Sequence, residues 1–75
     1  MGPQIQPRTA HGDLPLTPQQ LKVWALMARG LTNKEICREL GLGDGTVRAH
    51  TSEVLRRTGT GCRVKAALQW HGIAA

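Results

Sequence analysis

Three glycines divide the chain into short segments, and this division constrains the fold more than any other feature of the sequence. Gly30, Gly41 and Gly59 each follow a stretch whose apolar residues recur at helical spacing, every three or four positions. Nothing in residues 14–75 shows the alternation of apolar and polar residues that is typical of a half-buried strand. The pattern predicts an all-α fold, with a three-helix core and a C-terminal fourth helix. These helices are expected at about residues 18–29, 33–40, 44–58 and 63–71.

Two threonines mark the starts of the first two helices. Thr17 is followed by Pro18, which suits the first helical position, and by Gln20, which completes a T-x-x-Q capping box. Thr32 and Glu35 form a second box of the same kind. Each box satisfies backbone N–H groups that a helix start otherwise leaves without partners.

The apolar positions of these helices predict one thin core, because a chain of 75 residues buries little surface. In the last helix, Val64, Ala67 and Leu68 fall on one side. Trp70 falls opposite Leu68, and we expect it to be exposed, where it would suit an interface with a subunit or a partner. The inward-facing residues expected in the first three helices are Val23, Trp24, Met27, Ala28, Ile36, Cys37, Leu40, Val47, Thr51, Val54 and Thr58.

Residues 1–13 differ in character from the rest of the chain. They contain two Pro and two Gly and have no periodicity, so we expect a flexible N-terminal tail or linker before a domain at residues 14–75. No apolar run approaches 18 residues, and the N-terminus lacks the apolar centre of a signal peptide. The expectation is a cytoplasmic protein without a membrane span, in which Cys37 and Cys62 stay reduced.

The second and third helices are joined by the short turn Gly41-Leu42-Gly43. A short helix, a glycine-containing turn and a longer helix make a helix-turn-helix, whose second helix can enter the major groove of duplex DNA. The net charge of +5 and the pI near 10.3 favour a polyanionic partner. Residues 44–65 carry five basic and two acidic side chains, a net charge of +3 within this stretch.

One side of the third helix has the character of a base-reading surface. Arg48, Ala49, Ser52 and Arg56 cluster there at 100° per residue and form a small, polar and cationic face. Arginine is the usual bidentate reader of guanine, and alanine can touch the methyl group of thymine. Arg56 lies two turns after Arg48, where phosphates are the nearer partners. Glu53 borders this face and either accepts from a cytosine amino group or repels the DNA backbone.

Residues 16–68 resemble the LuxR-type helix-turn-helix domain, also called FixJ/NarL-type. The resemblance implies sequence-specific binding to double-stranded promoter DNA, as the output domain of a bacterial response regulator or related regulator, with RNA polymerase as a further partner. The motifs that carry the resemblance are Leu16-Thr17-Pro18, Ala28-Arg29-Gly30-Leu31-Thr32-Asn33-Lys34-Glu35-Ile36, Leu40-Gly41-Leu42 and Gly45-Thr46-Val47-Arg48-Ala49-His50.

Carried over by position, the resemblance assigns roles to individual residues. Arg48, Ala49 and Ser52 fall where the family reads bases. Lys34 and Thr46 fall where it holds phosphates. The fourth helix falls where the family often dimerises, which implies a weak homodimer on DNA.

The departures from the family pattern bear on stability and dimer strength more than on DNA binding, and two of them lie at helix starts. Gly43 replaces the usual Ser at the start of the third helix, so that cap relies on the backbone alone. Cys62 stands where Ser or Asn commonly caps the fourth helix.

Two other functions remain open. The promoter-recognition region of a sigma factor shares this type of helix-turn-helix, but it would need a core-polymerase-binding region that these 75 residues lack. A small regulator-like module could instead pair with a full-length regulator through the fourth helix and inhibit it. Arg48 and Arg56 argue against such a module, because pure protein binding has no need of them.

The sequence contains no pattern that indicates catalysis or metal binding. No convergent set of titratable groups is visible, so we expect no enzyme and no cofactor. Cys37, Cys62, His50 and His71 form no C-x-x-C or H-x-x-x-H pair, so we expect no metal site.

Overall fold

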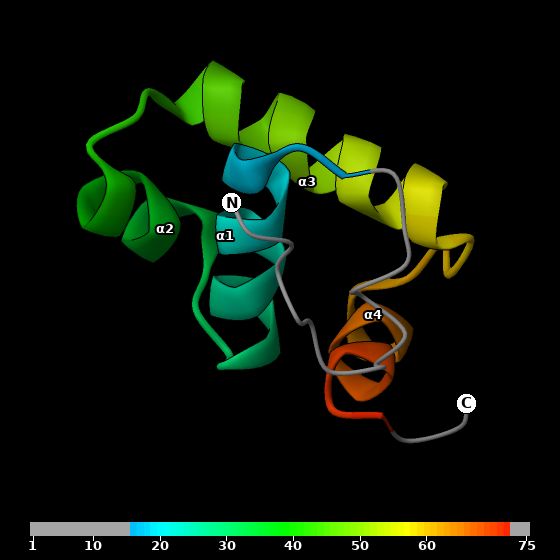
Figure 1. Ribbon diagram of the computed structural model, residues 1–75. Helices are drawn as coiled ribbons and strands as arrows, with labels where there is room; N and C mark the ends of the chain where they lie inside the picture. The colour runs from blue at the N-terminus through cyan, green and yellow to red at the C-terminus, as the bar shows by residue number, and fades with distance from the viewer. Residues whose placement is uncertain (1–15, 73–75) are drawn as a thin grey trace, which may run out of the picture.

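The computed structural model describes residues 16–72, and these form four α-helices and no strand. The helices are α1 (Pro18–Ala28), α2 (Asn33–Leu40), α3 (Asp44–Thr58) and α4 (Arg63–Trp70). Helix α3 runs along one side of the molecule, with α1 packed beneath it and α2 and α4 near its two ends (Figure 1). The all-α prediction and the four expected helices are confirmed, whereas the expected tail at residues 1–13 lies outside the described residues.

Both capping boxes form as the sequence predicts. The Thr17 hydroxyl accepts from the Gln20 N–H at 3.1 Å, and the Gln20 side-chain oxygen accepts from the Thr17 N–H at 3.0 Å. The Thr32 hydroxyl and the Glu35 carboxylate make the same exchange at 3.2 and 2.8 Å. Two short helices are thereby fixed at their first turns by local contacts alone.

The turn that orients α3 depends on a left-handed glycine. Gly41 ends α2 with φ +68°, a conformation that side-chain-bearing residues rarely adopt. The next N–H, that of Leu42, donates to the Cys37 carbonyl at 3.0 Å, and the Leu42 side chain packs partly buried against the core. The chain therefore turns from α2 into α3 within three residues, and α3 packs against α1 and α2.

Most of the expected inward-facing residues are buried, but Ala28, Cys37, Leu40 and Thr58 are only partly buried. Leu26 and Ala66 are buried in addition to the predicted set. Thr51 is buried too, and its hydroxyl donates to the Arg48 carbonyl at 2.9 Å, so this polar group keeps a partner. The buried hydrophobic residues are Val23, Trp24, Leu26, Met27, Ile36, Val47, Val54 and Ala66.

Two tryptophans attach α4 to α1. Trp24 is fully buried, and its indole N–H donates to the Ala66 carbonyl at 2.8 Å. Trp70 packs edge-on against Trp24, with ring centroids 5.2 Å apart. The expectation of an exposed Trp70 was therefore wrong. One helical turn separates Ala66 from Trp70, so the face of α4 that buries Ala66 also turns Trp70 inward.

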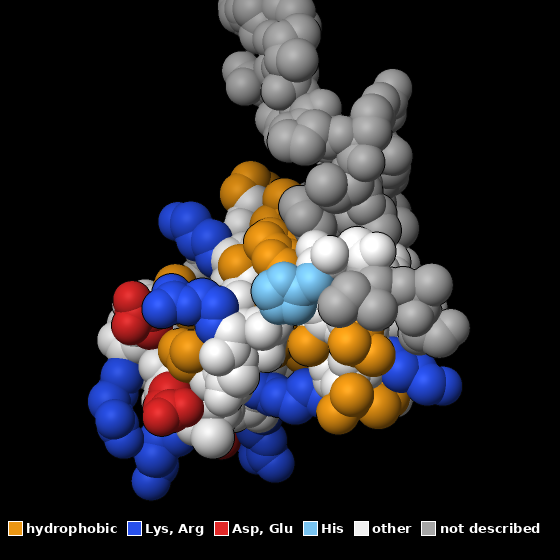
Figure 2. All heavy atoms as spheres, turned by 90° about the horizontal axis from the view of Figure 1, so that it is seen from below, with side chains coloured by type: hydrophobic (Ala, Val, Ile, Leu, Met, Phe, Trp, Pro, Cys, Tyr) orange, Lys and Arg blue, Asp and Glu red, His pale blue; other side chains and the backbone are white. Residues whose placement is uncertain are grey.

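The other apolar side of α4 is only partly covered. Val64, Ala67 and Leu68 share one side, as expected, but this side borders an open groove of about 370 Å³ instead of the core. Val64 is 67% exposed. Seen from the side away from α3, hydrophobic side chains reach the surface in patches bordered by Lys and Arg (Figure 2). The groove is lined by Met27, Ala28, Gly30, Leu31, Thr32, Arg63, Val64, Ala67 and Leu68.

Candidate nucleic-acid interface

Helix α3 has a buried face and an exposed face of different chemistry. Val47, Thr51 and Val54 are buried against the rest of the domain. The predicted base-reading residues and Arg56 are all exposed, and they recur at positions 48, 49, 52 and 56 along the same helix. The core therefore fixes the orientation of α3 while its small, cationic side stays open to a ligand.

Arg48 is held only loosely within the domain. Its guanidinium lies 3.6 Å from the Asp44 carboxylate, one turn earlier, and the two side chains are 68% and 66% exposed. An exposed ion pair of this kind contributes little, because water screens it and two flexible side chains must be ordered. Arg48 can therefore leave Asp44 for another partner at small cost.

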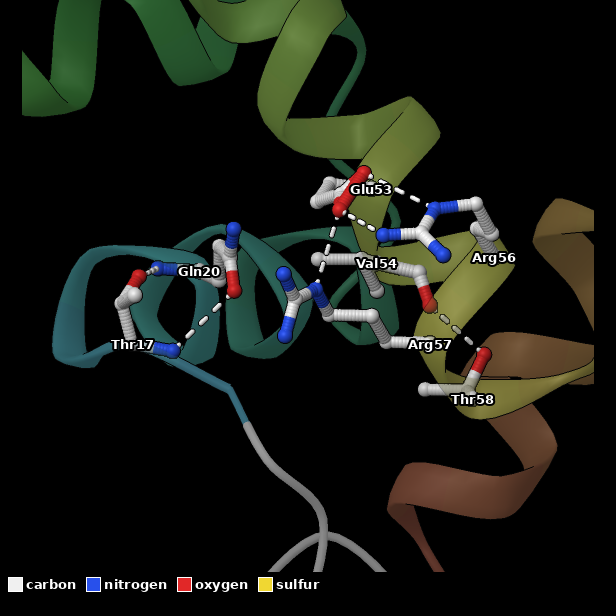
Figure 3. A network of polar contacts seen from close by, with 7 residues as sticks. All are labelled: Thr17, Gln20, Glu53, Val54, Arg56, Arg57 and Thr58. Atoms are coloured by element: carbon white, nitrogen blue, oxygen red, sulfur yellow. Dashed lines mark hydrogen bonds and ion pairs between the residues drawn. The ribbon is translucent and has the colours of Figure 1, made fainter.

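Arg56 is held more firmly, by Glu53. Its Nε and Nη2 atoms donate to the two oxygens of the Glu53 carboxylate, with Nε to Oε1 at 3.1 Å. The Nε of Arg57 donates to the same carboxylate at 3.0 Å. In Figure 3 the carboxylate lies between the two arginines, and the Arg57 guanidinium points toward the start of α1, where Gln20 lies.

These contacts fix the charge state of Glu53. The hydrogen bonds from Arg56, and then those from Arg57, lower the pKa of the Glu53 carboxyl from 4.5 to about 2. The same carboxylate raises the pKa of Arg56. The two roles expected for Glu53, as a cytosine acceptor or as a repulsive group, did not include this pairing. Its spacing of three and four residues from the arginines was the signal that could have found it.

The two predicted phosphate contacts outside the central part of α3 lie at helix starts. Lys34 is exposed in the first turn of α2, and Thr46 is exposed in the first turn of α3. Helix starts present free N–H groups and positive dipole ends, which favour anions. Both residues are therefore accessible from solvent at points where a phosphate would be stabilised.

Arg63 is bonded to other parts of the domain and does not lie on the exposed face of α3. Its Nη1 donates to Asn33 Oδ1 and its Nη2 donates to the Leu31 carbonyl, both at 2.9 Å. These bonds tie the start of α4 to the start of α2. The partners lie 30 and 32 residues away in sequence, so no local pattern could indicate them. Arg63 therefore does not add to the cations of the α3 face, although the sequence count included it.

Residues 16–72 contain neither a candidate metal site nor a candidate membrane span. No group of three or more His, Cys, Asp or Glu is placed to hold a metal ion in this part of the chain. None of the helices there is long and apolar enough to cross a membrane.

Cys62 precedes α4 without a side-chain capping bond, and the N–H groups of Lys65 and Val64 lower the pKa of its thiol.

Comparison with known proteins gives consistent matches. Residues 14–69 match the model of the family described as bacterial regulatory proteins, luxR family. The chain is 38% identical over 56 residues to the nitrate/nitrite response regulator protein NarL of Escherichia coli K12, a match covering 75% of this chain and 26% of NarL. The transcriptional regulatory protein LiaR of Bacillus subtilis gives the same identity and coverage. The Fimbriae Z protein of Salmonella typhimurium is 34% identical over 53 residues, which cover 71% of this chain and 25% of that protein.

The chain thus spans about a quarter of the length of these relatives. No solved structure gave a significant match.

Proposed function

This chain belongs to the luxR family of bacterial regulatory proteins, which regulate transcription by binding DNA, and on that premise we propose that it binds double-stranded promoter DNA in a sequence-specific manner. The observation that carries the proposal is the two-sided helix α3. Its buried face is anchored by Val47 and Val54, and its exposed face is small and cationic. A helix of this shape fits the major groove, which is wide enough to admit it.

Three residues of this face are proposed to read bases. Arg48 lies in the second turn of α3, close to the helix start, where a recognition helix meets base edges. Its weak pairing with Asp44 leaves its fork of donors available to a guanine. Ala49 and Ser52 are exposed beside it, and they can contact a thymine methyl group and a polar base edge, respectively.

Three further residues are proposed to hold the DNA backbone. Lys34 and Thr46 lie at the starts of α2 and α3, where the helix dipoles favour a phosphate. Arg56 lies two turns beyond Arg48 on the same side, where the groove curves away from the helix. These contacts set affinity and register but carry no sequence information.

The relatives support a place for the domain within a longer regulator. NarL is named a response regulator protein, and this chain matches about a quarter of its length. We infer that the domain acts as an output module, that it pairs weakly with a second copy through α4 when both are bound to DNA, and that RNA polymerase is a further partner. Exposed Val64 and its groove offer only a small apolar area, which supports weak pairing.

The test is a selection from random duplexes, followed by titration of the selected site over a range of salt. Three or four cations near the DNA predict that log affinity falls against log salt with a slope of about −2.7 to −3.6 per bound monomer. Affinity that does not change with salt, or no selected sequence, would contradict the proposal. A module that binds only protein would give the second result.

A further inference from the structure

The basic stretch at the end of α3 contains one acidic side chain, that of Glu53. Glu53 lies between the base-reading residues and the paired arginines at 56 and 57. Its carboxylate accepts from both arginines, so three charges with a net charge of +1 replace two independent cations. Phosphate contacts draw their strength from cations that release counterions, so this pairing bears directly on DNA affinity.

We propose that Glu53 acts as a built-in counterion that limits how strongly the C-terminal half of α3 holds the DNA backbone. The inference rests on the proposed DNA-binding function and assigns Glu53 a positioning role through Arg56 and Arg57. In this role Glu53 competes with a DNA phosphate for the arginines, and it need not touch the DNA itself.

The geometry of Arg56 supports competition. The Nε and Nη2 atoms form one edge of the guanidinium, which is one of the edges that can grip two oxygens of a phosphate. In this structure that edge faces Glu53. A phosphate must displace the carboxylate from this edge or bind the remaining edge beside a negative charge. Either course weakens the contact.

The ion pairs near the two ends of α3 hold their arginines to different degrees. Arg48 has one contact of 3.6 Å to a carboxylate that is 66% exposed. The Glu53 side chain is only 29% exposed, and it is bonded from both sides. The base-reading arginine is thus easily released, whereas the arginines near the backbone are restrained. Weak backbone contacts leave base readout a larger share of the total binding energy.

The experiment compares Glu53→Gln with Glu39→Gln, on a selected duplex and on a scrambled one. Glu39 is an exposed acid on α2, so the two variants change net charge equally but at different places. We expect Glu53→Gln to bind both duplexes roughly three- to tenfold more tightly near 0.1 M salt, with a salt slope steeper by about one to two. Glu39→Gln should leave the slope within about 0.3 of that of the parent chain.

A second comparison tests whether Glu53 acts through its arginines. In a chain carrying Arg56→Ala and Arg57→Ala, Glu53→Gln should give no gain in affinity. If that chain does not fold by circular dichroism, Arg56→Ala alone should reduce the gain by about half. A full gain in the folded arginine variants would overturn the inference, because Glu53 would then act directly on the DNA.

A readout without DNA tests the pairing of Glu53 with its two arginines independently of binding data. The Nε–H protons of Arg56 and Arg57 should exchange slowly with water in ¹⁵N-resolved NMR spectra, and Glu53→Gln should make both exchange faster. Exchange that is equally fast in both proteins would show that the pairing does not persist in solution and would refute the inference.

The inference and the proposed function fail in different ways. If the parent chain binds its selected duplex but Glu53→Gln leaves affinity and slope unchanged, or weakens binding, the inference is wrong and the proposed function stands. If neither protein binds any duplex at low salt, both are wrong.

Discussion

Replacing Arg63 by alanine should destabilise the domain and leave the salt dependence of DNA binding unchanged. Arg63 is one of the ten basic residues of the chain, and its charge alone would suggest a phosphate contact. Its guanidinium is instead bonded to Asn33 and to the carbonyl of Leu31, where it joins the start of α4 to the start of α2.

The size of the effect follows from these two bonds. Hydrogen bonds that involve a charged group contribute about 1.5 to 3 kcal/mol each when they are well shielded. The two bonds of Arg63 are part-buried, so solvent screening reduces their contribution. The free energy of unfolding of Arg63→Ala should therefore be lower by about 1 to 3 kcal/mol in total. A chain of this length has roughly 4 to 11 kcal/mol of total stability, so the loss would be large.

The assay is urea denaturation followed by far-ultraviolet circular dichroism, with Asn33→Ala and the double variant as matched controls. Asn33 supplies one of the two acceptors, so the double-mutant cycle should give a coupling energy of at least about 0.5 kcal/mol. A loss of stability below about 0.5 kcal/mol for Arg63→Ala would refute the structural role. A salt slope that became shallower by about one would show that Arg63 contacts a phosphate after all.

Three further predictions follow from other parts of the structure. Cys62→Ser should raise the midpoint of thermal unfolding by about 2 to 8 °C. The reason is that a Ser oxygen can accept from the N–H groups of Val64 and Lys65, which already lower the pKa of the thiol. An unchanged or lower midpoint would contradict this prediction. The folded-state pKa of Glu53 lies at about 2, below its ordinary 4.5. The stabilising effect of the Glu53 carboxylate should therefore be complete above about pH 4.5 and disappear as the pH falls toward 2. Acid titration should show this loss of stability in the parent chain but not in Glu53→Gln. The free domain should sediment as a monomer at micromolar concentration and pair only on DNA with half-sites about one helical turn apart, and a tight dimer without DNA would argue against the weak α4 surface.

The parts of the fold that the sequence predicted correctly are those determined by neighbouring residues. Both capping boxes join residues three positions apart, so the threonines and their partners could be paired by spacing alone. Gly41 ends α2 through its own backbone conformation. For the same reason, the exposed face of α3 could be predicted from the helical period.

The parts that could not be predicted depend on contacts between distant segments. Helix α4 packs on α1 through contacts such as the bond from Trp24 to the Ala66 carbonyl, 42 residues away, and in this position Trp70 packs against Trp24. The role of Arg63 also depends on partners far along the chain. For the candidate site, the sequence predicted which cations lie on α3. The pairing of Glu53 with Arg56 and Arg57 spans only three and four residues, so its spacing could also have indicated it.

The most direct test of the central claim, that α3 reads sequence, is the affinity of Arg48→Ala for a selected duplex and for a scrambled one. Arg56→Ala serves as the comparison, since its proposed partner is a phosphate. Arg48→Ala should cost about 1 to 3 kcal/mol on the selected site, relax the preference at one base pair and change affinity for the scrambled duplex much less. Arg56→Ala should weaken both complexes alike. If Arg48→Ala lowers the affinity for both duplexes equally, α3 does not read sequence through this residue and the assignment of the site is wrong.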